Sequence, residues 1–222
     1  DGVKGSVFDP LDTGFATGKF TALMDVRAGI VGNIDYSSSV VPKWKTLSPG
    51  QSVNYVESHD NMTLFDKIQS SVKGVTPTES AKLSRLSTSF AFLAQGLPFM
   101  QAGQEFLRTK KGDSNSYKSS DEVNSIKWDT KSTNLTTVNY FKGLIALRKA
   151  HPAFRMSSPA SNSAKGFVCM IPAAIDFSHS AFNCSTDSMQ IRSSPSSVDQ
   201  IGMGIPQYLD LDKFQSFAFS NH

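Results

Sequence analysis

The sequence predicts an α/β fold in which parallel strands are joined by helices. Segments with a helical period alternate with short β-rich segments, in the order helix, strand, helix, strand, long loop and helix. Such an alternation is typical of a parallel sheet with helical crossovers. Polar loops also follow the carboxyl ends of both predicted strands, as in a barrel whose strand-to-helix loops form the functional site.

The first half of the chain contains one predicted helix and one predicted strand. Residues 1–20 are rich in Gly, Asp and Thr and are expected to form an irregular loop. A helix is predicted over residues 21–33, because apolar side chains recur there near a period of about 3.6 residues. Loop returns through Pro42 and Pro49, and residues 52–57 form the first predicted strand.

The second predicted helix has the clearest boundaries. Thr76 is suited to the N-cap, Pro77 to the first helical position, and Glu79 completes a capping box. Apolar residues then recur at helical spacing as far as Leu93. Gly96 follows as a stop signal.

The second half begins with a predicted strand at residues 97–102. A long polar loop is expected over residues 109–133, and a third helix over residues 137–150 ends before Pro152. Beyond Met156 the chain becomes rich in Ser and loses clean periodicity. We therefore expect an irregular or small β tail over residues 157–222.

Composition argues against several functional classes. The net charge is only +3, and no basic run exceeds the pair Lys110-Lys111, so nucleic-acid binding is not expected. No apolar run approaches the roughly 20 residues that span a bilayer, so no membrane segment is expected. The opening residues do not form a signal peptide, and the sequence leaves both secretion and a cytoplasmic location open. Cys169 and Cys184 can form one disulfide, but they lack the spacing of a zinc site.

The run Tyr-Val-Glu-Ser-His-Asp-Asn at residues 55–61 is the most informative in the chain. It places His59, Asp60 and Asn61 at the carboxyl end of the first predicted strand, where barrel enzymes carry their catalytic residues. Adjacent residues of an extended chain point apart, so Ser58, His59 and Asp60 cannot form a hydrolase triad by themselves. A sugar suits the pair better, because a carboxylate accepts hydrogen bonds from its hydroxyls and an imidazole donates one. The alternative is that Asp60 or Asn61 caps a short helix.

Two polar segments follow the second predicted strand. Glu105 lies at its end, where a structural role at the rim is favoured over substrate binding. In the next loop, Tyr117 has a ring that can stack on a sugar face, and Asp113 and Asn115 can bind hydroxyls. The same Asp and Asn residues are equally ordinary components of a turn.

These residues resemble the α-amylase superfamily of glycoside hydrolases (family 13), and in particular its type I pullulanases. The run at 55–61 is similar to the fourth conserved region of the superfamily. The run Gly-Leu-Pro-Phe-Met-Gln-Ala-Gly-Gln-Glu-Phe-Leu-Arg-Thr-Lys at 96–110 is similar to the eighth-strand segment of those pullulanases. Further segments are similar to those pullulanases and occur in the same order as in them: residues 5–8, 26–32, 115–128 and 141–154.

The resemblance implies the C-terminal portion of a (β/α)8 TIM-type barrel. Residues 1–156 would form a partial catalytic domain from helix six to helix eight. In the family a β-sandwich domain follows the barrel, but residues 157–222 do not resemble it. They would be a divergent Ser-rich tail, and a remnant of that domain is one interpretation of them. The resemblance also implies roles for two residues: Asp60 matches the carboxylate that stabilises the transition state, and His59 matches a substrate-binding histidine.

The implied activity is the hydrolysis of α-1,6-glucosidic linkages in pullulan or starch-type glucans by a retaining mechanism. Its binding partner would be an α-glucan polysaccharide or oligosaccharide, held also by Asn61, Asp113, Asn115 and Tyr117. Retention needs two carboxyl groups about 5–5.5 Å apart, as nucleophile and as acid/base. The sequence matches neither of these regions, so the 222 residues are expected to be inactive alone.

Other interpretations are open. The chain can come from an isoamylase or a branching-type enzyme, or it can be a non-catalytic module that binds a glucan or a partner. It can also be an unstable piece, because a partial barrel exposes open sheet edges. No cofactor is expected; calcium occurs in the superfamily, but the sequence contains no clear cluster of ligands for it.

Overall fold

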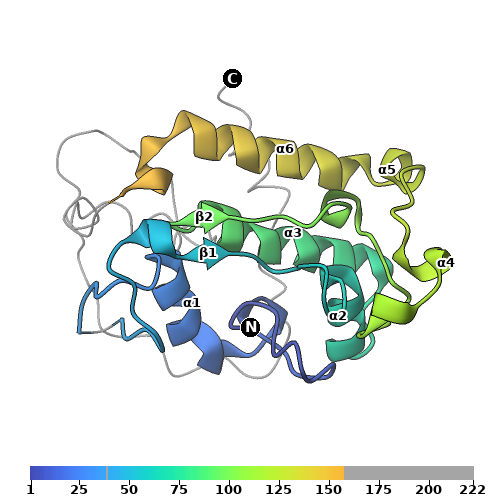
Figure 1. The fold of residues 1–222 in the computed structure, drawn as a ribbon, viewed down its shortest axis with the longest axis horizontal. Helices are drawn as coiled ribbons and strands as arrows, with labels where there is room; N and C mark the ends of the chain where they lie inside the picture. Colours follow the sequence, from blue (N-terminus) through green and yellow to red (C-terminus); the bar gives the residue numbers. More distant parts are fainter. Residues whose placement is uncertain (39, 158–222) are drawn as a thin grey trace.

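The computed structural model describes residues 1–38 and 40–157. The predicted tail lies outside these residues, apart from its first residue, and so do Cys169 and Cys184. Within the described part, the helices and strands are α1 (Leu23–Ile30), β1 (Val53–Asn54), α2 (Leu64–Ser71), α3 (Pro77–Leu93), β2 (Leu97–Pro98), α4 (Asp121–Asn124), α5 (Thr130–Thr133) and α6 (Leu135–Ala150) (Figure 1). None of the helices in this part is long and apolar enough to cross a membrane.

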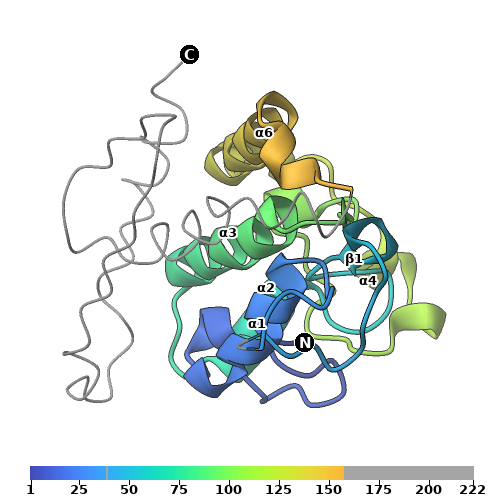
Figure 2. The same cartoon turned by 90° about the vertical axis from the view of Figure 1, so that its left-hand side faces the viewer.

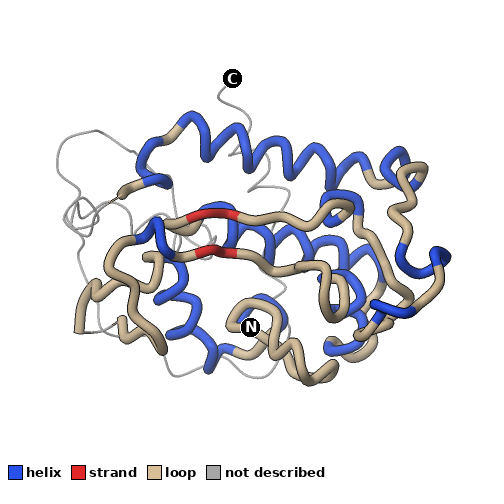
Figure 3. The backbone as a smooth tube through the Cα atoms, viewed as in Figure 1, coloured by secondary structure: helices blue, strands red, loops and turns tan. Residues whose placement is uncertain are grey.

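The two strands are parallel, as the alternation of elements predicts. Val53 lies opposite Leu97 and Asn54 opposite Pro98, and α2 and α3 form the connection between the strands. Figure 3 shows the strands side by side. They are shorter than the predicted segments 52–57 and 97–102, because the chain leaves the ladder after Phe99 N donates to the carbonyl of Asn54 (2.9 Å). A bend follows β1 at Val56, and a turn follows β2 at Ala102.

The helices agree with their predictions to different degrees. The capping box of α3 forms as predicted: Thr76 Oγ1 accepts from Glu79 N, and Glu79 Oε2 accepts from Thr76 N. The first predicted helix is shorter than residues 21–33, because Gly32 and Asn33 adopt left-handed backbone angles (φ of 77° and 57°) that end it. The last predicted helix begins two residues earlier than expected, at Leu135.

Helix α2 is absent from the predicted order of elements, and the sequence indicates it only through the alternative that Asp60 or Asn61 caps a short helix. It buries Asp66 and Lys67 along with Leu64 and Ile68, so its apolar pattern is too sparse to indicate a helix. The loop predicted over residues 109–133 likewise contains the short helices α4 and α5, which bury none of their side chains.

The core forms where α3 packs between α6 and the pair α1 and α2 (Figure 2). Its largest cluster joins the segment after β1, helices α2, α3 and α6, and the turn after α6 through fully or nearly buried apolar side chains: Val56, Leu64, Ile68, Ala91, Phe92, Leu93, Tyr140, Phe141, Leu144 and Phe154. The rings of Phe92 and Phe141 meet edge to face with their centroids 5.8 Å apart. Burial of each large apolar side chain contributes about 1.5–3 kcal/mol, so this cluster holds the helices against the strands.

The other face of the strand pair is about half exposed in the part of the chain that the structure describes. Val53, Tyr55, Leu97 and Phe99 are 43–55% exposed, although all four are apolar or aromatic. The rings of Tyr55 and Phe99 pack edge to face on this side, with centroids 5.8 Å apart. Such a half-covered parallel pair is unusual, since parallel sheets are normally covered on both faces.

Candidate functional site

The His-Asp-Asn run forms an exposed turn between β1 and α2. The side chains of His59 and Asp60 are 80% and 72% exposed, and His59 Nε2 lies 3.3 Å from Asp60 Oδ2. The expectation that they point apart is wrong, because the strand ends at Asn54 and the chain is no longer extended here. An imidazole and a carboxylate therefore face solvent together.

The alternative interpretation of this run as a helix cap is also wrong. Thr63 is the N-cap of α2, and its hydroxyl accepts a hydrogen bond from Asp66 N at 3.2 Å. A second amide at this helix end, Leu64 N, donates to Glu57 Oε2 at 2.9 Å. The cap is thus built without Asp60 or Asn61, which leaves the exposed carboxylate of Asp60 available for another role.

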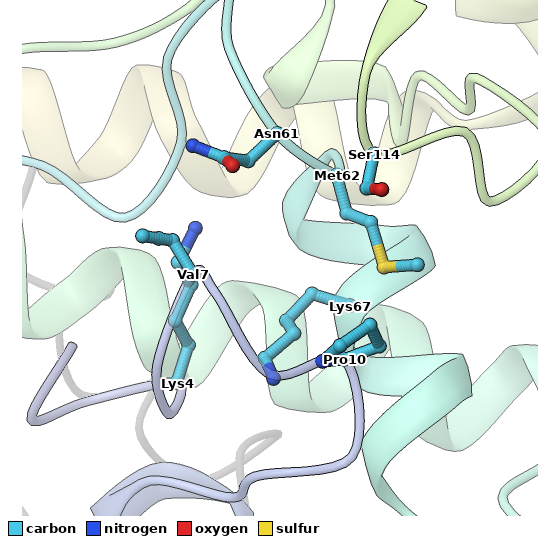
Figure 4. Close-up of a pocket in the computed structure, with 7 residues that line it drawn as sticks. All are labelled: Lys4, Val7, Pro10, Asn61, Met62, Lys67 and Ser114. Atoms are coloured by element: carbon cyan, nitrogen blue, oxygen red, sulfur yellow. The ribbon is translucent and has the colours of Figure 1, made fainter.

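Asn61 is the most constrained residue of the turn. Its backbone has a φ of 61°, in the left-handed region that non-glycine residues rarely occupy. It lines a small pocket together with residues of the N-terminal loop, of the same turn, of α2 and of the loop after β2: Lys4, Val7, Pro10, Met62, Lys67 and Ser114 (Figure 4). The turn after β1 and the loop after β2 therefore adjoin each other at this pocket.

A buried lysine from the loop after β2 contacts the turn directly. Lys110 is 2% exposed, and its Nζ donates to the carbonyls of His59 (2.7 Å) and Asn61 (2.9 Å). The Asp66 carboxylate of α2 accepts from Lys110 N at 2.7 Å and from the Thr109 hydroxyl at 2.5 Å. Sequence reasoning missed both Lys110 and Asp66, because a buried charged residue carries no local signal that separates it from a surface one.

The polar loop that contains Asp113, Asn115 and Tyr117 has the contacts of a turn. Asp113 Oδ1 accepts from Asn115 N (2.8 Å) and Oδ2 accepts from the Ser119 hydroxyl (2.5 Å), and these bonds lower the pKa of Asp113. The Tyr117 ring is 74% exposed, with Lys118 Nζ 5.2 Å from its centroid. Sugar binding by these three residues stays a prediction.

Glu105 has the structural contact that the sequence favours. Its Oε2 accepts a hydrogen bond from Gly103 N at 3.0 Å within the turn that follows β2. Gly103 has a φ of 96°, so the carboxylate supports a backbone conformation that suits glycine.

Glu57 lies beneath the exposed turn. It is 2% exposed, and burial raises its pKa from the ordinary 4.5 to about 7, against the opposing effects of the Leu64 amide and the charge of Lys4. Lys4 is buried as well, and burial lowers its pKa from 10.5 to about 8. Because one oxygen of Glu57 is held by Leu64 and the side chain is enclosed, this carboxyl cannot reach a substrate at the surface.

The raised pKa predicts that Glu57 lowers stability as pH rises. The folded state holds its proton more tightly than the unfolded state, so between pH 5 and pH 7.5 the free energy of unfolding should fall by about 2 kcal/mol. Urea unfolding followed by circular dichroism measures this fall. Glu57→Gln should remove it, whereas Glu122→Gln, at an exposed carboxylate, should keep it. An equally steep fall in Glu57→Gln would contradict the assignment.

Metal-binding side chains do not gather in the described part of the chain. In residues 1–38 and 40–157, no group of three or more His, Cys, Asp or Glu residues is placed to hold a metal ion.

Two parallel strands joined by helices, with polar residues gathered beyond the strands' carboxyl ends, define an α/β protein of the kind that binds ligands at that edge. A search of protein-family models finds no match. Curated relatives do match: the pullulanase of Bacillus subtilis (strain 168) is 44% identical over 162 residues, which are 72% of this chain and 22% of that protein. Isoamylase of Pseudomonas amyloderamosa is 32% identical over 146 residues, covering 52% of this chain and 19% of that protein.

Solved structures give the same result. A mutant pullulanase of Paenibacillus barengoltzii complexed with maltotetraose has a TM-score of 0.69 and 43% identity, covering 72% of this chain and 24% of that one. Type I pullulanase of Bacillus subtilis complexed with maltose has a TM-score of 0.66 and 43% identity, covering 72% and 22%. The resemblance to type I pullulanases is therefore confirmed, and the chain spans about a fifth to a quarter of the length of these relatives.

Proposed function

We propose that this chain forms part of the active site of a glucan-debranching glycoside hydrolase that cleaves α-1,6 linkages in pullulan or starch-type glucans with retention. The observation that carries the proposal is the exposed His59–Asp60 pair, 3.3 Å apart, beyond a parallel strand. This pair lies in a sequence that is 44% identical to a pullulanase over 162 residues.

Residues 1–156 are proposed to be the last part of a (β/α)8 barrel. In this assignment α1 is helix six, β1 and β2 are strands seven and eight, and α6 is helix eight. The parallel register of β1 and β2 supports it, as does the open apolar face of the pair, which a complete barrel would cover. Residues 157–222 are proposed as a separate tail.

Asp60 is proposed to stabilise the transition state, and His59 to bind a substrate hydroxyl. The exposed Asp60 carboxylate can accept hydrogen bonds from sugar hydroxyls and lie near the positive charge that develops on the ring. His59 can donate to a hydroxyl and, from 3.3 Å, also orient the carboxylate. The amide of Asn61, the polar groups of Asp113 and Asn115, and the Tyr117 ring are proposed as further sugar contacts.

The 222 residues by themselves are proposed to bind an α-glucan without cleaving it. Retaining hydrolysis needs a nucleophile and an acid/base about 5–5.5 Å apart. The carboxylates that flank the turn in sequence, Glu57 and Asp66, are buried and hydrogen-bonded to backbone amides, so neither can serve beside Asp60.

The test measures binding and turnover with the same protein. Isothermal titration with maltotetraose should show saturable binding, and pullulan should release no reducing ends above background. Asp60→Ala should weaken maltotetraose binding about tenfold or more, the loss of a charge-assisted hydrogen bond. Asp35→Ala, an exposed aspartate in the loop before β1, should bind as the unchanged chain does. Turnover by the chain alone would overturn the proposed inactivity, and absence of binding would overturn the glucan site.

An isoamylase-type specificity is the second candidate. Its support is the 32% identity to the isoamylase of Pseudomonas amyloderamosa, below the 44% identity to the Bacillus subtilis pullulanase. Grafting residues 1–156 into the matching part of that pullulanase separates the two. Preference of the graft for pullulan over glycogen supports the first candidate, and the reverse preference supports the second.

A further inference from the structure

We propose that Lys110 is a positioning residue, whose buried ammonium holds the backbone on both sides of Asp60 and thereby fixes the direction of the Asp60 carboxylate. The consequence for glucan binding rests on the proposed function. The claim that Lys110 holds the turn rests on its hydrogen bonds from the loop after β2 to the turn after β1. These bonds do not depend on the proposed function.

Two hydrogen bonds, which we call the clamp, join the loop after β2 to the turn after β1. Lys110 Nζ donates to the carbonyl of His59 at 2.7 Å and to that of Asn61 at 2.9 Å, so the two bonds bracket Asp60. Fixing the carbonyl on each side of a residue restricts its backbone angles, and these set where its side chain points. The Asp60 side chain is 72% exposed and lies 3.3 Å from His59, so its direction depends on the backbone of these two residues.

The turn needs such support. Asn61 has a left-handed φ of 61°, a conformation that is unfavourable for a non-glycine residue. Two hydrogen bonds from a charged donor can offset that cost, because they are stronger than bonds between neutral groups. Loss of the ammonium should therefore let the turn relax.

The backbone of Lys110 is held in place from α2. Asp66 accepts from Lys110 N at 2.7 Å and from the Thr109 hydroxyl at 2.5 Å, so the root of the lysine side chain is fixed to the helix that follows the turn. Burial lowers the pKa of Lys110, and the charge of Arg108 acts in the same direction, whereas the charges of Glu57, Asp113 and Asp60 oppose it.

The neighbouring lysine provides a matched control. Lys111 is on the same loop, but its side chain is 59% exposed and pairs with Glu122 rather than with the turn. Lys110→Met and Lys111→Met therefore remove the same charge from adjacent positions, and only the first removes the clamp.

The experiment uses the full chain and two readouts. Amide hydrogen exchange, followed by mass spectrometry, reports on residues 58–63 and, as a measure of the remaining fold, on α3. Isothermal titration with maltotetraose reports on the site. Lys110→Met should speed exchange in residues 58–63 at least about tenfold and raise the Kd for maltotetraose about tenfold, with α3 unchanged. Lys111→Met should change neither, and Lys110→Arg, which keeps a charged donor, should recover part of both.

Each outcome decides the proposal. Unchanged exchange in residues 58–63 of Lys110→Met overturns the clamp. Faster exchange with unchanged maltotetraose affinity overturns the positioning role. If the unaltered chain does not bind maltotetraose, the proposed function fails, and the exchange measurement still decides whether Lys110 holds the turn. If Lys110→Met also loosens α3, Lys110→Gln takes its place, and unchanged exchange in that variant overturns the clamp.

Discussion

Asp60→Asn should lower kcat about 1000-fold in a Bacillus subtilis pullulanase whose matching segment is replaced by residues 1–156 of this chain. That loss corresponds to about 4 kcal/mol of transition-state stabilisation. Asparagine keeps the shape of aspartate and can still bind a hydroxyl, but it carries no negative charge to stabilise the positive ring of the transition state. KM should therefore change far less than kcat.

Two controls make the graft interpretable. Asp35→Asn alters an exposed aspartate in the loop before β1 and should leave kcat unchanged. The thermal unfolding transition of the unsubstituted graft shows whether it folds. A folded graft without activity on pullulan would contradict the assignment of this segment to a debranching site. Activity of Asp60→Asn within tenfold of the unsubstituted graft would contradict the role of Asp60.

Arg148→Met should lower the free energy of unfolding by about 3–5 kcal/mol, because it leaves buried carbonyl groups without their donor. Arg148 lies on α6, 7% exposed, and its guanidinium donates to three carbonyls at the C-terminal end of α3: Phe92 (2.8 Å), Ala94 (2.7 Å) and Gly96 (2.6 Å). These carbonyls have no partners within α3, because the helix ends at Leu93. Methionine fills similar space but leaves them unsatisfied.

Urea unfolding followed by circular dichroism tests this effect. Arg27→Met makes the same replacement at an exposed position of α1 and should change stability by less than about 0.5 kcal/mol. Arg148→Lys should be intermediate, because a single ammonium cannot reproduce the planar fork of a guanidinium. A loss below about 1 kcal/mol in Arg148→Met would show that water or a shift of α3 satisfies the carbonyls.

Predictions that depend on residues close together in the sequence were the accurate ones. The capping box at Thr76 and Glu79 depends on residues three apart, and it formed as predicted. Helix α2 was missed because its buried face includes Asp66 and Lys67, whose partners lie far away in sequence. The strands were drawn too long because β-rich composition continues past Asn54, whereas pairing stops there.

The candidate site divides in the same way. His59, Asp60 and Asn61 were found because they are consecutive and follow a strand. The structure places the His59 and Asp60 side chains together and makes Thr63, not Asp60, the cap of α2. Both results depend on where the strand ends and the helix begins. The turn contacts of Asp113 include the Asn115 amide and the Ser119 hydroxyl, which agree with the turn alternative and leave its sugar-binding role as a prediction.

The sequence by itself determined the alternation of helices and strands, the limits of α3, the resemblance to type I pullulanases and the position of the His-Asp-Asn run. These follow from patterns among neighbouring residues and from motif order. Only the tertiary structure decided that Lys110 is buried beneath the turn while Lys111 is exposed, and that Glu57 has a raised pKa. Both depend on contacts across long separations, such as the sequence separation of 51 that joins Lys110 to His59. Burial and charge at such distances depend on packing, which adjacent residues do not specify.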